Sequence, residues 1–499
     1  MIMAGMQISG LASGMDTDSI IKNLMQVEQS KIDKVDKQKM LLEMRQEVWA
    51  EMNAKLYSFY TKNLFELKSQ GSYKTKNVTI SDETKIGVSA SSSAVAGIHT
   101  LKVTQLAKGA HLYSNAIADD TVVTSEAMAF KLSDGTKTVD IELAAGATIS
   151  DLMTAINEQD LNITASYDSK NKRIFMNSTS MGDTSAIQFS EVDSAAEADF
   201  FTSLGFSVNG TTIKDVDAGA LGAAGQNSIY EYDGIVFEDN SNSVSVNGLS
   251  LTLKAESTNI TVNITNDTEA VYNKIKDFIK AYNDLIEDMT TKLDAKSNKY
   301  EPLTNAEKES LDDKTIESWE AKVKERLLRR DDKLTSISST MRSILTSSSG
   351  VDMSKLSEGF RFLSELGIVT GDYTEKGKLH IEGDSEDSLF ALKPNKLKEA
   401  LEENPEKVAA LFTAIGNKLY TTMADKMKST SLNSALTFYN DKQMKKQVTE
   451  YEDRMFDLES RMSAMETRYR AQFTAMEQAI QKANNQSTYL SNMLSGSSS

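Results

Sequence analysis

The sequence predicts an α+β protein in which long terminal coiled-coil helices and a helical leg domain flank a β-rich head inserted in the middle of the chain. Three observations support this prediction. Apolar residues near both ends repeat at alternating spacings of three and four. Neither Gly nor Pro interrupts residues 17–68 or 441–494. Between residues 72 and 267, short alternating apolar segments are separated by Ser- and Gly-rich turns, which is typical of β-strands.

The apolar pattern of the two ends predicts a seam along each helix, because a 3.5-residue period keeps one side of a helix against a partner. Glu28, Lys31, Gln38 and Arg45 occupy seam positions in the first helix. Polar seam residues lower stability but restrict register, so we expect this helix to be fully ordered only in an assembly. The candidate seam and oligomer residues are Ile21, Leu24, Val35, Leu42, Trp49, Met52, Leu56 and Phe59, together with Met444, Val448, Tyr451, Met455, Leu458, Met462, Met465, Tyr469, Phe473, Met476 and Ile480.

The middle of the chain is expected to contain a β-β-α-β-β unit. Its first hairpin turns at Asp134-Gly135, and Ser150 is placed to cap the short helix that follows. Helix returns at Asn266, which with Glu269 resembles a capping box. The next helix has a broad apolar face suited to packing in a globular bundle.

These patterns predict five segments. The predicted domain ranges are an N-terminal coiled-coil segment at 1–40, a leg-domain helix at 41–71, the β-rich head at 72–267 with a subdivision expected near 115–125 and 210–230, a helical leg domain with a small extended insertion at 268–435, and a C-terminal coiled-coil helix with a flexible tail at 436–499.

Composition excludes several classes of function. The net charge of −17, concentrated in 72–267, argues against a nucleic-acid partner. The absence of cysteine excludes disulfides and zinc sites built on thiolates. His99, His111 and His380 lie far apart, and no recognised catalytic, phosphate-binding or calcium-loop motif occurs. We therefore expect no enzyme activity, no catalytic residue, no cofactor and no metal. We also expect no membrane span and no cleaved secretory signal.

Several short motifs resemble those of one family in collinear order along nearly the whole chain. The stretches are ISGLASGMD at 8–16, AGIHTLKVTQLA at 96–107, TISDLMTAIN at 148–157, FIKAYN at 278–283, GKL at 377–379 and KLKEALEENPEKVAALF at 396–412. Together they resemble the hook-associated protein 2 family of bacterial flagellar filament-capping proteins. The third stretch is similar to a short Ile-Asn repeat found in hook-associated proteins.

The resemblance implies a structural protein at the distal tip of the filament, outside the cell, exported by the flagellar type III route without a cleaved signal peptide. Several copies, as a pentamer or a hexamer, would form a ring whose terminal helices dock into the filament end. Flagellin would fold and insert beneath this cap instead of being lost. The implied partners are other copies of the chain, flagellin, hook–filament junction proteins during initiation, and an export chaperone.

Two alternative functions stay open at this stage. A tip-exposed head could act as an adhesin for host mucin or glycans, and a hook–filament junction protein would use similar end helices. The opening motif and the helix carrying Tyr282 and Asn283 favour the cap over the junction protein. The seam pattern does not decide how many copies assemble, nor whether the terminal helices pair within one chain or between chains.

Overall fold

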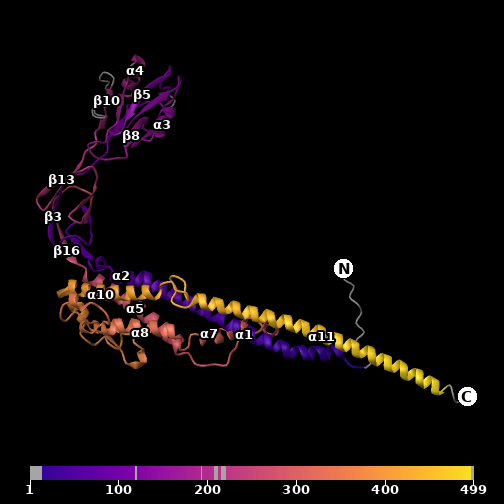
Figure 1. Ribbon diagram of the computed structural model, residues 1–499. Helices are drawn as coiled ribbons and strands as arrows, with labels where there is room; N and C mark the ends of the chain where they lie inside the picture. The colour runs from indigo at the N-terminus through magenta and orange to yellow at the C-terminus, as the bar shows by residue number, and fades with distance from the viewer. Residues whose placement is uncertain (1–13, 119–120, 193, 207–211, 215–220, 496–499) are drawn as a thin grey trace. The chain divides into compact units, whose positions relative to one another are not determined.

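The structure is a computed structural model of the chain, and it describes residues 14–118, 121–192, 194–206, 212–214 and 221–495. It confirms the α+β class, with long helices near both ends and antiparallel sheets between them (Figure 1). The chain forms two compact units. The first combines Met1–Tyr73 with Val271–Ser499, and the second is Lys74–Ala270.

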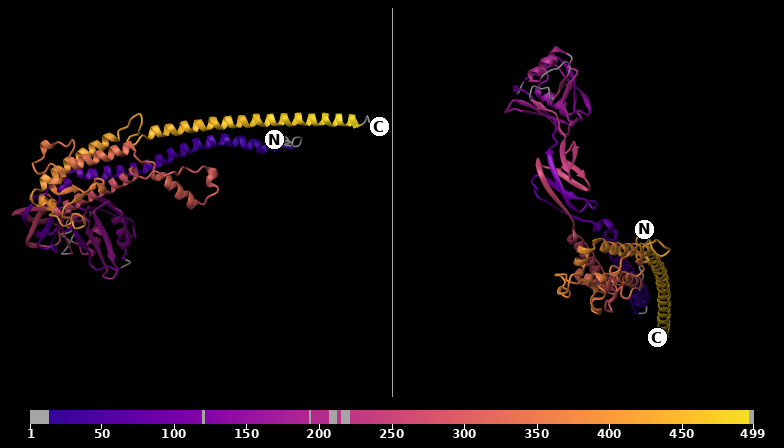
Figure 2. Two further views of the ribbon diagram at one scale, coloured as in Figure 1. Left: turned by 90° about the horizontal axis from the view of Figure 1, so that it is seen from below. Right: turned by 90° about the vertical axis from the view of Figure 1, so that its left-hand side faces the viewer.

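The first unit begins with the long helix α1 (Thr17–Ser58), whose N-terminus is capped by Asp16. Its last element is α11 (Asp441–Ser495), which lies beside α1 (Figures 1 and 2). In both stretches the unbroken apolar repeat and the absence of Gly and Pro favour continuous helix. In the described part of this unit, no helix is both long enough and apolar enough to cross a membrane, and the same holds for the described part of the second unit.

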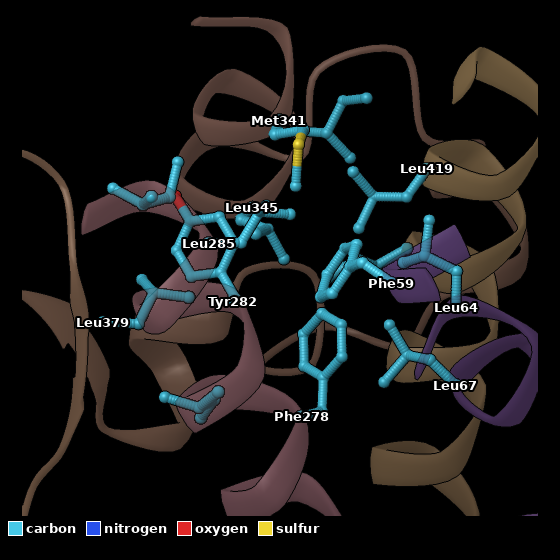
Figure 3. Close-up of a cluster of buried hydrophobic side chains, with 14 of the residues drawn as sticks. Phe59, Leu64, Leu67, Phe278, Tyr282, Leu285, Met341, Leu345, Leu379 and Leu419 are labelled. Carbon is cyan, nitrogen blue, oxygen red and sulfur yellow. The ribbon is translucent and has the colours of Figure 1, made fainter. Parts of the chain in front are cut away.

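A helical bundle packs around the C-terminal end of α1, which we call its inner end. It buries one extended apolar core, part of which is shown in Figure 3. Tyr282 donates to the Gly377 carbonyl at 3.1 Å, and Asn283 exchanges two hydrogen bonds with the Leu379 backbone, which attaches the small β-hairpin to the bundle. The bundle elements are α5 (Thr268–Leu293), α6 (Asn305–Lys308), α7 (Asp313–Glu325), α8 (Asp332–Ser347), α9 (Lys396–Glu403), α10 (Pro405–Lys426), and the hairpin strands β17 (Ile368–Thr370) and β18 (Leu379–Ile381).

A π-helical segment, Phe59–Leu64, joins α1 to the short helix α2 (Phe65–Lys68). Its wider turn explains the spacing of the buried side chains. Phe59 and Leu64 are both buried although they are five residues apart, a separation that suits the i→i+5 hydrogen bonds of a π-helix. A regular α-helix would instead turn Asn63 toward the core. The local distortion therefore keeps Leu64 and Leu67 inside the bundle.

Deleting the exposed Lys62 should be tolerated, because it converts the π-turn into an α-turn and leaves Phe59 and Leu64 on the same face. We expect a loss of no more than about 1 kcal/mol in the free energy of unfolding. Deleting the exposed Ala54 in regular helix rotates the following residues by about 100° and should cost more than about 3 kcal/mol. Urea denaturation monitored by circular dichroism compares the two. Equal losses would refute this account.

The second unit contains two hydrophobic cores. One is formed by a five-stranded sheet, in the order β1-β16-β3-β12-β13, and a three-stranded sheet, β14-β15-β2. All the strand pairs in both sheets are antiparallel. The strands are β1 (Lys76–Ile80), β2 (Ile86–Ala90), β3 (Gly97–Gln105), β12 (Ser228–Tyr232), β13 (Ile235–Asp239), β14 (Ser243–Val246), β15 (Leu249–Leu253) and β16 (Ser257–Asn266).

The other core of this unit is drawn from residues between Ala110 and Phe206. It lies among two four-stranded sheets, β10-β9-β5-β6 and β11-β4-β8-β7, and two short helices. The elements are β4 (His111–Tyr113), β5 (Met128–Ser133), β6 (Thr138–Leu143), α3 (Ile149–Asn157), β7 (Ile163–Asp168), β8 (Arg173–Ser178), β9 (Gln188–Ser190), α4 (Ala195–Ser203), β10 (Thr212–Lys214) and β11 (Gly222–Ala223).

Two predicted helix caps are wrong by one or two residues. Thr148, not Ser150, caps α3, because Thr148 and Asp151 form a reciprocal capping box. Strand β16 continues through Asn266, so Asp267 accepts the Ala270 backbone N–H at the start of α5 instead. In both cases the side chain with the correct three-residue spacing to a free N–H becomes the cap.

Asp134, at the turn between β5 and β6, should make the second unit sensitive to acid. Burial acts to raise the pKa of its carboxyl, but hydrogen bonds from Asn162, Lys137 and Thr136 outweigh burial and hold the pKa well below the ordinary 3.8. This stabilisation is therefore complete above about pH 4 and is lost as the pH falls through the lowered pKa. At pH 7, Asp134→Asn should have a lower free energy of unfolding than the unchanged protein. Urea denaturation should show a smaller difference between the two free energies at pH 2. A difference that is the same at both pH values would contradict this role.

Candidate functional site: the paired terminal helices

Helices α1 and α11 pair in antiparallel orientation within one chain. Trp49 stacks on Tyr439, two residues before the start of α11, with ring centroids 5.3 Å apart. Further along, Lys39 Nζ lies 4.0 Å from Glu452 Oε1, and near the start of α1 Arg470 Nη1 lies 3.0 Å from Asp18 Oδ1. A later residue of α11 thus contacts an earlier residue of α1, which shows that the two helices are antiparallel. We call this arrangement the terminal-helix pair (Figure 2).

At its inner end the terminal-helix pair is part of the bundle core. Trp49, Met52 and Leu56 of α1 and Phe59 of the π-helical segment are buried there, and Met444 of α11 joins the same core. These five seam residues are therefore packed inside the first unit. Leu42 is partly buried against the edge of this core.

Asp331 attaches α1 to the bundle and has no counterpart among the residues predicted from the sequence. Its buried carboxylate accepts hydrogen bonds from Arg45 Nη2 at 2.7 Å and from the Trp49 indole at 3.2 Å. It also caps α8 by accepting the backbone N–H groups of Lys333 and Leu334, each at 3.0 Å. The sequence assigns the acidic pair Asp331-Asp332 to a solvated turn or a helix cap, and the cap is confirmed, whereas the contacts with α1 were not predicted. Its contacts depend on a helix almost 300 residues away, with sequence separations of 286 and 282.

Away from the bundle, the seam is only partly enclosed. Ile21, Ile32 and Val35 of α1 are buried. A pair of helices covers its seam from one side only, which leaves long side chains partly accessible. The partly buried seam residues of α11 are Val448, Tyr451, Met455, Leu458, Met462, Met465, Tyr469, Phe473, Met476 and Ile480.

Leu24 lies outside this seam within the single chain, where it is 40% exposed. The enclosed positions on α1 run through Ile21, Met25, Glu28 and Ile32. The first enclosed residue after Ile21 is therefore four positions later, whereas the apolar pattern predicted one three positions later. Met25 and Ile32 were missed, although their four-three spacing with Ile21 and Val35 could have identified them.

The C-terminal part of α11 extends beyond its partner. Because Arg470 already lies opposite Asp18, the 25 residues from there to Ser495 add about 37 Å of helix. We call residues 483–495 the α11 extension. Tyr489, Leu490 and Met493 are 65%, 58% and 60% exposed, and the sequence holds no charged residue after Lys482. Exposed apolar side chains on an uncharged helix are typical of a surface that a partner covers.

The electrostatics of the pair are local and weak. Hydrogen bonds from the side chain and backbone of Ser19 lower the pKa of Asp16, in keeping with its capping role. The Arg470–Asp18 pair joins two exposed side chains, and such pairs contribute little to stability. Apolar contact along the seam therefore carries most of the pairing.

The three histidines occupy separate places. His99 contacts Asp233 at 2.7 Å, His380 contacts Asp387 at 2.6 Å, and His111 lies against Tyr113. Among the residues described by the structure, no group of three or more His, Asp or Glu side chains is placed to hold a metal ion.

Two models of one protein family match this chain, one in its N-terminal part and one in its C-terminal half. The model described as "Flagellar hook-associated protein 2 C-terminus" matches residues 225–485, more than half of the chain, and "Flagellar hook-associated protein 2 N-terminus" matches residues 13–110. The "Flagellin hook IN motif" matches residues 127–180, which include the predicted Ile-Asn repeat.

Individual relatives agree over almost their full lengths. The chain is 25% identical to flagellar hook-associated protein 2 of Halalkalibacterium halodurans, covering 96% of this chain and 98% of the relative. It is 24% identical to the Escherichia coli protein of the same name, covering 99% of each. The fold is similar to the crystal structure of the flagellar cap protein FliD D1-D2-D3 domains from Escherichia coli, with a TM-score of 0.54, 23% identity and coverage of 75% of this chain and 95% of that chain. The chain belongs to the flagellar hook-associated protein 2 family.

Proposed function

We propose that this protein is the structural cap at the distal tip of the bacterial flagellum, where it promotes folding and insertion of exported flagellin and prevents its loss. Membership of the hook-associated protein 2 family supports this role, as does the similarity of the fold to that of a flagellar cap protein from Escherichia coli. The observation that carries the proposal is the α11 extension, an uncharged helix with exposed apolar residues beyond the terminal-helix pair.

The terminal-helix pair would act as a leg. Its inner end is anchored in the bundle through Trp49 and Asp331, so a force on the leg is transmitted to the first unit. Its outer end presents Leu24 and Val27 on α1 and Leu490 on α11 as exposed apolar residues. Burying such side chains between the helices at the filament end would stabilise docking by about 25 cal/mol for each Å² of apolar surface removed from water.

Several finer parts of the role are proposals of the same kind. Copies of the chain would assemble as a pentameric or hexameric ring, with the second unit as head and the first as leg domain. The chain would reach the tip by flagellar type III export, and the absence of cysteine suits a protein exported unfolded. The role requires positioning of a client chain and no catalytic group, so we propose a purely structural function. Junction proteins and an export chaperone would be its partners during initiation.

The comparisons do not favour the alternatives of an adhesin or a hook–filament junction protein, since the reported relatives bear the hook-associated protein 2 name. The deciding experiment deletes the gene in its source organism and follows flagellin. We expect bare hooks, abundant soluble flagellin in the medium, and motility restored by adding back the purified full chain. Normal filaments with only adherence lost would overturn the proposal.

A further inference from the structure

The sulfur chemistry of this chain resides entirely in methionine, since it has 23 methionines and no cysteine. Four of them, Met455, Met462, Met465 and Met476, lie on the part of the α11 seam outside the bundle core, and all four are partly buried. Their side chains are therefore partly accessible to solvent while they supply apolar contact to the pair. By contrast, the core methionines of the same unit are almost fully enclosed: Met52 and Met289 are 0% exposed, and Met341 and Met423 are 1% exposed.

The outer seam is held by apolar side chains of both helices. On α1, Ile21, Ile32 and Val35 are buried there. Among the described residues, the ion pairs between α1 and α11 are Asp18–Arg470, with two exposed side chains, and Lys39–Glu452, with an exposed Glu452 and a partly buried Lys39. Exposed pairs of this kind are each worth about 0–1 kcal/mol. The outer pairing therefore depends on apolar contact, to which the four methionines of α11 contribute.

We propose that the methionine seam, Met455, Met462, Met465 and Met476, is an oxidation site through which peroxide separates the terminal-helix pair. In each event a sulfur lone pair attacks one oxygen of hydrogen peroxide, the O–O bond breaks, and water leaves after proton transfer. The sulfur is oxidised by two electrons to the sulfoxide, and the peroxide is reduced. No further reactant is needed.

The sulfoxide changes the seam because it replaces a flexible apolar thioether with a polar, chiral group that favours water. A polar group on a seam destabilises pairing. Core methionines such as Met52 and Met341 are shielded from peroxide, so the bundle stays folded while the outer pair opens. The inference concerns the isolated chain and does not depend on the proposed function as a cap.

The test treats the purified full chain with graded hydrogen peroxide and measures sulfoxide at each methionine by peptide mass spectrometry. Amide hydrogen exchange follows residues 455–476 in the same samples. We expect the exposed Met493 to react first, the four seam methionines next and the core methionines last. Exchange of the 455–476 amides should accelerate at least tenfold as the seam reacts, while amides of α5 stay protected.

A matched variant carries Met455→Leu, Met462→Leu, Met465→Leu and Met476→Leu, which keeps the seam apolar without an oxidisable sulfur. Its exchange at 455–476 should not respond to peroxide. Two results would overturn the proposal: seam methionines that react no faster than Met52 and Met341, or seam sulfoxides that form without any change in exchange. Both readouts come from the unchanged chain, so they stand even where the variant pairs poorly.

Discussion

Placing two charges on the apolar face of the α11 extension, as Leu490→Glu with Met493→Glu, should abolish motility and release soluble flagellin into the medium. Both side chains are exposed in the single chain, so the isolated protein should fold with unchanged stability. Docking, however, would have to bury two carboxylates, and burying unpaired charges is strongly unfavourable. Motility in soft agar and immunoblotting of flagellin in the culture supernatant provide the measurement.

The matched control places the same charges on the opposite face of the same helix, as Thr488→Glu with Ser491→Glu. At about 100° per residue these positions point away from Leu490 and Met493. The control should swim and retain flagellin. Equal loss of motility in both variants would show that charge anywhere on the extension is harmful, and normal motility in both would remove the extension from the docking surface.

Asp331→Ala should destabilise the first unit by about 3 kcal/mol, the largest stability effect that we expect from a single substitution here. The change removes the cap of α8 and leaves the buried Trp49 indole N–H and one side of the Arg45 guanidinium without their acceptor. Loss of a helix N-cap alone costs about 1 kcal/mol. Urea denaturation of the full chain, followed by circular dichroism at a helix wavelength, measures the difference.

The neighbouring Asp332 is the natural comparison for this substitution. It is exposed and lies in the first turn of the same helix. Asp332→Ala should change the free energy of unfolding by no more than about 0.5 kcal/mol. If the two variants lose equal stability, the contacts of Asp331 with α1 contribute nothing and the effect belongs to the helix N-terminus as a whole.

Local signals in the sequence predicted the secondary structure well wherever one physical rule dominated. The repeat of apolar residues without Gly or Pro identified α1 and α11, and the alternating segments identified the β-rich middle. The π-helix was not predicted from the sequence, because it forms only so that Leu64 can pack in the same core as Phe59. The caps of α3 and α5 were misplaced for a similar reason: several adjacent polar residues could cap, and backbone geometry selects one.

The candidate site also has some features that the sequence predicts and others that only the packing of the helices decides. The seam of α11 could be read from its period alone, since every predicted position on it is buried or partly buried. Leu24 lies outside the seam within one chain because steps of three and of four residues both fit a heptad, and the partner helix decides between them.

The sequence by itself therefore determined the α+β class, the long terminal helices and the family resemblance, because these rest on short-range periodicity and collinear motifs. Only the tertiary structure decided that the terminal helices pair within one chain and antiparallel, that Asp331 ties α1 to α8, and that Tyr489, Leu490 and Met493 of the α11 extension are exposed. Those features depend on contacts between residues hundreds of positions apart, and the local pattern along a chain carries no information about which distant segment will supply the partner.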